Sequence, residues 1–128
     1  MKDIIKIAFH LLNLILILFY IYPGSILGKV LYNDWKQQPK ITRDFIVSSE
    51  HFYAFLLLSI LGILSYLNNK KINFIVKYLF VLSIILELFH IIIPRRSFEF
   101  SDLFGNILGV IIVFIVYKIW RKYEHIRR

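Results

Sequence analysis

Five side chains able to do chemistry lie within or beside the apolar stretches of this chain: His51, Glu87, His90, Asp102 and Asn106. An ionisable group inside a membrane segment is energetically costly, so it usually faces protein or water and marks a functional site. A carboxylate beside an imidazole can orient the ring or shift its protonation. The function of the chain is therefore expected to depend on these residues.

Their spacing predicts that these groups converge. Glu87 and His90 are three residues apart, and Asp102 and Asn106 are four apart, so each pair shares a helix face. At a rise of 1.5 Å per residue, Glu87 lies about 10 Å and His90 about 6 Å inside the end of their helix. The next helix descends from the same end, and His51 opens another helix there. We expect one outward-facing polar pocket.

The elements that position these groups are expected to be membrane helices. Hydrophobic residues make up 59% of the 128 residues, against roughly 45–50% in ordinary soluble domains. They form four blocks, most of them close to the roughly 20 residues that cross a bilayer. We expect an all-α, four-helix transmembrane bundle, a single domain over residues 1–128. Its predicted helices span about 4–22, 50–67, 73–93 and 102–120. A cleaved signal peptide is the alternative for the first block.

Charge predicts the orientation of the bundle. Of the 16 lysine and arginine residues, ten lie at the termini or around the 68–73 turn, and six lie in the two other loops. Positive charge concentrates in cytoplasmic segments, so both termini are expected to be cytoplasmic and the 23–50 and 94–102 loops to face outward. The net charge of +8 is read as topology, and we expect no nucleic-acid partner.

Smaller signals concern packing. Residues 26–35 have near-helical apolar spacing, which predicts either a short interfacial helix or an ordered loop. Gly105 and Gly109 form a Gly-x-x-x-Gly pair that lets another backbone approach closely, and we expect it to press the fourth helix against the third. Asp102 is expected to cap the fourth helix. His10 and Asn13 are expected to join helices by hydrogen bonds.

Residues around the third loop carry a family resemblance. They are Glu87-Leu88-Phe89-His90, Ile93-Pro94-Arg95-Arg96-Ser97-Phe98, Asp102-Leu103 and Gly105-Asn106-Ile107-Leu108-Gly109, with His51 at the start of the second helix. In order and spacing they resemble the VanZ-like family, whose pattern has glutamine at position 90 and glycine at position 95. The resemblance implies a multi-pass protein of the bacterial plasma (inner) membrane, grouped with a teicoplanin-resistance factor. A link to glycopeptide antibiotic tolerance follows as an expectation.

Three functional hypotheses stay open. The first is a non-enzymatic or accessory module that recognises an anionic, lipid-linked headgroup or cell-envelope component. The second is an intramembrane hydrolase or transferase acting on such a headgroup. The third is a small structural subunit that binds a larger membrane protein through the Gly105 and Gly109 face. Whether the protein is an enzyme is left open.

Each hypothesis assigns roles to the same residues. In the first, Arg96 holds the anion bidentately, and the ligand-binding candidates are His51, Glu87, His90, Arg96, Ser97, Asp102 and Asn106. In the second, Glu87 or His90 is the catalytic acid or base and Ser97 a nucleophile. No complete metal motif occurs, so no metal and no cofactor are expected. A mononuclear site at His51, Glu87, His90 and Asp102 is the minor alternative.

Overall fold

The computed structural model describes residues 1–44 and 46–127, and within those ranges every regular element is a helix. Four helices are long and apolar enough to cross a membrane, and one short helix lies between the first two. Arg128, counted above with the basic C-terminal residues, lies outside the described part. The elements are α1 Lys2–Ile21, α2 Ile26–Tyr32, α3 Ser49–Tyr66, α4 Ile72–Leu88 with a 3₁₀ turn Phe89–Ile91, and α5 Phe100–Arg127.

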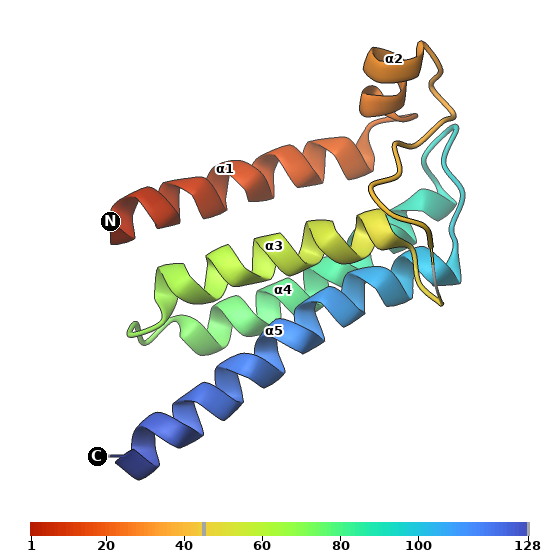
Figure 1. Ribbon diagram of the computed structural model, residues 1–128. Coiled ribbons are helices and arrows are strands. Elements are labelled where there is room, and N and C mark those ends of the chain that lie inside the picture. The colour runs from red at the N-terminus through yellow and green to blue at the C-terminus, as the bar shows by residue number, and fades with distance from the viewer. Residues whose placement is uncertain (45, 128) are drawn as a thin grey trace.

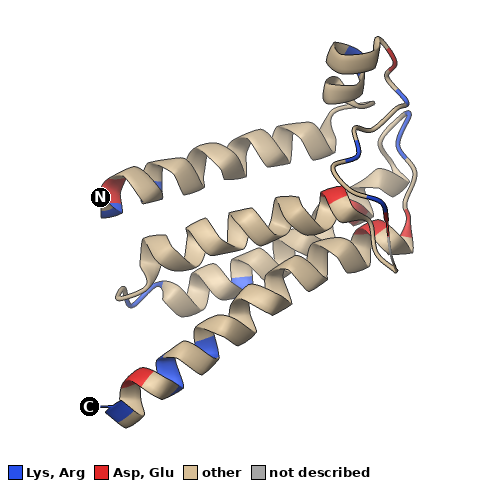
Figure 2. Ribbon diagram, viewed as in Figure 1, with Lys and Arg blue, Asp and Glu red and all other residues tan. Residues whose placement is uncertain are grey.

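The helices form a bundle with two different ends (Figure 1). Both termini and the tight α3–α4 turn lie at one end, here called the turn end. The α1–α3 connection and the α4–α5 loop lie together at the other, here called the loop end. Acidic residues gather mainly at the loop end, while lysine and arginine occur at both ends (Figure 2). The functional candidates are therefore brought to one end of the bundle.

The short segment after α1 is a helix, which decides between the two structures left open for it. The Ser25 side chain caps α2 by accepting the Gly28 N–H at 2.9 Å. The helix ends at Asn33, whose φ of 56° places it in the left-handed region. Asparagine tolerates that conformation better than most residues.

Three helix ends differ from the approximate boundaries expected from the sequence. The third membrane helix ends at Leu88 and tightens into a 3₁₀ turn before Pro94. The fourth begins at Phe100, so Asp102 lies in its first turn and does not cap it. A carboxylate in a first turn still faces the positive end of the helix dipole. At its other end α5 continues to Arg127, through lysine, arginine and glutamate residues that favour helix.

The Gly-x-x-x-Gly pair packs α5 against α3, and not against α4 as expected. A Cβ on Gly105 would lie 2.8 Å from the Ser48 carbonyl oxygen, and one on Gly109 would lie 2.7 Å from that of Phe52. No side chain fits at such distances, so the two glycines allow the backbones of α3 and α5 to touch. Since α3 covers this face within one chain, the face is not available to a partner protein.

The remaining packing is apolar, with a few polar links. Phe9, Phe55, Leu58 and Leu79 are among the fully buried side chains of the core. Toward the turn end, His10 lies 3.1 Å from the Tyr66 hydroxyl, and the Tyr78 hydroxyl donates to Asn13 at 2.8 Å. These bonds confirm that His10 and Asn13 join helices. The buried ionisable groups lie at the other end of the bundle, the loop end.

Candidate functional site

A triangle of polar atoms from three helices forms the centre of the site. Tyr20 comes from the last turn of α1, His51 from the first turn of α3, and Asn106 from the second turn of α5. The Tyr20 hydroxyl donates to Asn106 Oδ1 at 2.7 Å and lies 2.8 Å from His51 Nδ1. His51 Nδ1 lies 3.2 Å from Asn106 Oδ1. All three residues are buried, Asn106 completely.

The hydrogen-bond geometry favours a proton on His51 Nδ1. Asn106 Nδ2 donates to the Ser83 carbonyl at 3.2 Å, which turns Oδ1 toward the triangle. Tyr20 has one hydroxyl hydrogen and gives it to Asn106, so the triangle is satisfied when His51 Nδ1 carries a hydrogen. The other ring nitrogen, Nε2, then faces Asp102 Oδ2 at 3.4 Å.

Glu87 and His90 form a second carboxyl–imidazole pair. His90 Nε2 donates to the Tyr20 carbonyl at 3.0 Å, because a carbonyl only accepts. Its Nδ1 lies 3.1 Å from Glu87 Oε1, which also accepts the Glu99 N–H at 3.3 Å. One proton is therefore held between Nδ1 and Oε1. The His90 ring stacks on Tyr20, with centroids 5.6 Å apart, so this pair is tied to the triangle.

The second oxygen of Glu87 is left without a hydrogen bond. Glu87 is completely buried, and among the described residues its Oε2 has no partner. His51 Nδ1 lies 3.8 Å from it, beyond hydrogen-bond distance. A buried acceptor without a donor costs about 1–3 kcal/mol, and more when it is charged. This atom is the most unusual feature of the site.

These groups are called the loop-end cluster below. The structure brings together six residues, five of them predicted from the sequence: Tyr20, His51, Glu87, His90, Asp102 and Asn106. Tyr20 was missed, because a tyrosine near a helix end is usually an interfacial anchor. The sequence signal for it is spacing, because Phe9, Leu16 and Tyr20 lie on one face of α1. The structure buries all three.

Arg96 and Ser97 lie at the edge of this cluster. The Arg96 guanidinium donates to the carbonyls of Phe19 at 2.5 Å and Tyr22 at 3.2 Å, so it caps the end of α1. Partial burial lowers the pKa of Arg96 below its ordinary value, while the nearby Tyr20, Glu87 and Asp102 act to raise it. Arginine stays charged at neutral pH, so a cation remains here.

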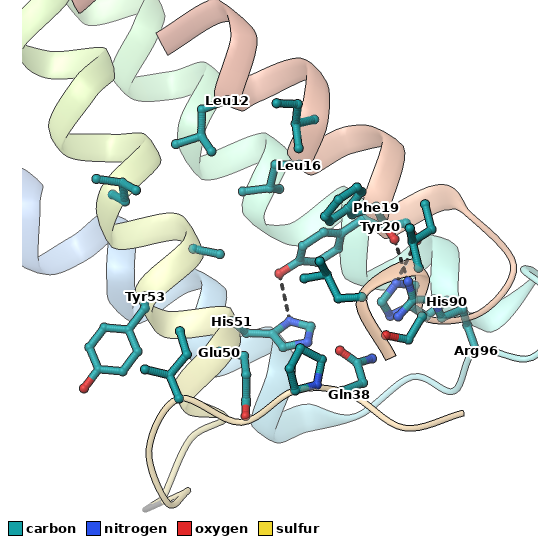
Figure 3. Close-up of a pocket in the computed structure, with 18 residues that line it drawn as sticks. Leu12, Leu16, Phe19, Tyr20, Gln38, Glu50, His51, Tyr53, His90 and Arg96 are labelled. Carbon is teal, nitrogen blue, oxygen red and sulfur yellow. Dashed lines mark hydrogen bonds between the residues drawn. The ribbon is translucent and has the colours of Figure 1, made fainter. Parts of the chain in front are cut away.

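Two adjoining cavities open beside the cluster. A cavity of about 440 Å³ lies between α1 and α3 and is lined mostly by aliphatic and aromatic side chains, including Leu12, Leu16 and Leu57. A smaller one of about 140 Å³ is polar and includes Ser97, Glu99 and Asp102. The walls of both include Ser25, Gln38, His90 and Arg96. Figure 3 shows Tyr20 and His51 meeting at one wall of the larger cavity, with His90 and Arg96 beside them.

Fold and site together define a class: a small multi-pass helical membrane protein with buried carboxyl–imidazole pairs at one end. Such pairs can exchange protons, orient a ligand or bind a cation. The chain matches the family model described as VanZ/LLP1 over residues 5–121, nearly its whole length, and it belongs to that family. Comparison with curated proteins and with solved structures gave no match.

Proposed function

We propose that the protein binds an anionic, lipid-linked molecule, whose headgroup occupies the polar pocket and whose hydrocarbon chain occupies the apolar cavity. The observation that supports this most directly is the junction of the two cavities at His90 and Arg96. A ligand that fills both needs one polar end and one apolar end. Lipids and lipid-linked envelope precursors have that form, so the module acts by recognition.

The charge of the polar pocket supports an anionic headgroup. Lys36, Arg95 and Arg96 contribute to its wall, together with the acids Glu99 and Asp102. Arg96 uses Nε and one terminal nitrogen on α1 carbonyls, and its five N–H donors exceed those two bonds. The remaining donors suit a phosphate or carboxylate oxygen.

The ligand is also expected to carry a hydroxyl donor beside its hydrocarbon chain. Glu50 contributes to the wall of the larger cavity, and its Oε1 is buried with no hydrogen-bond partner in the described part of the chain. Its other oxygen accepts from the Ser48 hydroxyl at 3.1 Å. A sugar or glycerol hydroxyl of the ligand supplies the donor that Oε1 lacks.

The orientation of the bundle supports recognition at the outer leaflet. Most lysine and arginine residues belong to the termini and the tight turn, which share one end (Figure 2). The distribution of positive charge predicts that this end is cytoplasmic and that the loop end with its cavities faces out. In a bacterial plasma membrane this is the side where envelope precursors are used. A role in tolerance of glycopeptide antibiotics is consistent with that position.

Bound lipid tests the proposal. We expect wild-type protein, extracted in mild detergent, to retain an anionic lipid identified by mass spectrometry. Ala54→Trp fills the apolar cavity and reduces the bound lipid several-fold, whereas Leu64→Trp, at an exposed position of the same helix outside the cavity, does not. Arg96→Ala also lowers it, while Arg121→Ala at the turn end is neutral. Equal lipid content in all these proteins would refute the proposal.

One observation favours an enzymatic alternative. Glu87 and His90 share a proton at 3.1 Å, and His90 and Ser97 both contribute to the wall of the polar pocket, where a headgroup would meet an acid–base group. A hydrolase or transferase is then expected to lose turnover of the retained lipid in Glu87→Gln combined with His90→Ala. Turnover that survives both changes removes this alternative.

A further inference from the structure

We infer that His51, Glu87 and Asp102 bind a divalent transition-metal ion such as Zn²⁺. One ring nitrogen of His51 and one carboxyl oxygen from each acid all lie within 4.8 Å of one another. Imidazole nitrogen and carboxylate oxygen together suit zinc and its neighbours better than calcium or magnesium, which prefer oxygen alone. This inference is independent of lipid binding.

The unpaired oxygen of Glu87 is a separate observation that points to a ligand. Its Oε1 is held by His90 and by the Glu99 N–H. Its Oε2 is buried and has no hydrogen-bond partner among the described residues. Glu87 is therefore already oriented by outer partners, as metal-binding carboxylates are. A cation at Oε2 replaces the missing donor.

His51 is oriented in the way that zinc-binding histidines are. Its Nδ1 hydrogen is directed to the Tyr20 and Asn106 oxygens, which leaves Nε2 on the side of Asp102. In metal sites one ring nitrogen binds the ion and the other donates to an acceptor behind it. The Nε2–Oδ2 distance of 3.4 Å is about what two ligands of one tetrahedral zinc show, given bonds near 2.1 Å.

The charge of the site and its access to water also favour a bound cation. Two carboxylates so close at the end of a membrane bundle repel each other and resist desolvation, and a divalent ion neutralises both. Asp102 contributes to the wall of the polar pocket, which gives an ion a route from water. Three protein ligands leave a fourth position open, as in catalytic rather than structural zinc sites. The ligand atoms are up to 4.8 Å apart. To bind one ion, the two most distant atoms must approach each other by about 1.5 Å.

Metal titration of the full chain tests the site. Protein in nanodiscs is stripped with chelator, titrated with Zn²⁺, desalted and measured for zinc by mass spectrometry. We expect about one ion per chain, and in Glu87→Gln or Asp102→Asn a loss of affinity beyond the roughly 10- to 100-fold that outer-shell changes cost. His10→Gln, at the histidine paired with Tyr66, is the control and keeps wild-type affinity. Wild-type affinity in both acid variants overturns the proposal.

A cobalt experiment keeps the test decisive if an acid variant folds poorly. The chain has no cysteine, so Asp102→Cys introduces its only thiol at a half-buried position. Co²⁺ bound there shows a thiolate-to-cobalt charge-transfer band in the near ultraviolet, and adding His51→Ala abolishes it. Circular dichroism and monodisperse size-exclusion profiles confirm folding. A folded Asp102→Cys protein that shows no band in saturating Co²⁺ overturns the proposal.

Discussion

The bundle contains two polar clusters built from the same three residue types, and they differ in what they leave unsatisfied. Toward the turn end, His10 pairs with Tyr66 and Asn13 pairs with Tyr78, at 3.1 and 2.8 Å. Each is a simple pair across two helices. Bonds of this kind are worth on average less than about 1 kcal/mol in a membrane bundle, so these pairs serve to align helices.

In the loop-end cluster, the same types form a closed triangle of Tyr20, His51 and Asn106, to which two carboxyl groups are added. The additions bring an unpartnered Glu87 oxygen and a polar pocket beside Asp102. Histidine, tyrosine and asparagine alone make an interhelical link. Carboxylates beside them add a buried acceptor that has no hydrogen-bond donor among the described residues.

The largest expected difference between the clusters concerns their asparagines. Asn106→Leu removes the acceptor of the buried Tyr20 hydroxyl and one of the two oxygens that face His51 Nδ1, which costs roughly 1–3 kcal/mol for the unpaired hydroxyl. Asn13→Leu removes one partly buried bond and costs about 1 kcal/mol or less. Reversible unfolding in mixed micelles measures both. Equal losses of stability would show that the two clusters are alike.

A smaller difference is expected for the tyrosine hydroxyls. Tyr20→Phe breaks the bond to Asn106 within a buried site and costs about 1–2 kcal/mol. Tyr66→Phe breaks one partly buried bond to His10 and costs a few tenths to about 1 kcal/mol. Unfolding midpoints of the two variants, compared with wild type, sharpen the contrast. A more severe Tyr66→Phe effect contradicts it.

Arg95, in the wall of the polar pocket, is a position where a substitution is expected to stabilise the folded protein. Arg95 has a φ of 62°, in the left-handed region that a non-glycine residue occupies at a cost of about 1 kcal/mol. Arg95→Gly relieves this strain and raises the unfolding midpoint, while weakening the binding of anionic lipid, because Arg95 contributes to the pocket wall. Arg43→Gly is the matched control for loss of a loop cation. A lower midpoint in Arg95→Gly would refute the strain.

The smallest predicted effect is pH-dependent and concerns the loop that covers the apolar cavity. The Lys40 side chain, 2.6 Å away, lowers the pKa of Asp44 below its ordinary 3.8, and the Ser49 N–H at the start of α3 adds to this. A lowered folded-state pKa stabilises the loop above pH 3.8, and this contribution is lost as pH falls through the folded value. An NMR titration of the Ser49 amide has its midpoint below 3.8, and Lys40→Ala moves it upward.

Helical periodicity predicted most of the site, because it fixes which residues share a face. Glu87 with His90, and Asp102 with Asn106, follow from spacings of three and four residues. It does not fix which faces meet. Gly105 and Gly109 packed on α3 instead of α4, since close approach depends on the matching surface of the other helix. That packing decided where His51 lies.

Some contacts of the site that the sequence does not predict are made to the main chain. Arg96 was expected to hold an anion, and its guanidinium also caps the carbonyls that end α1. In the same turn of α1, the Tyr20 carbonyl accepts a hydrogen bond from His90 Nε2. Main-chain acceptors have no signature in the sequence, because every residue has one. Only the geometry of the helix end shows that they are available.

These bonds make the end of α1 a mechanical link. Arg96 and His90 both attach the α4–α5 segment to carbonyls of the last turn of α1, and α1 forms one wall of the apolar cavity. An outward tilt of α1 would pull on His90, which also contacts Glu87 at 3.1 Å. A change in the width of that cavity would therefore displace the two side chains that tie α1 to the α4–α5 segment.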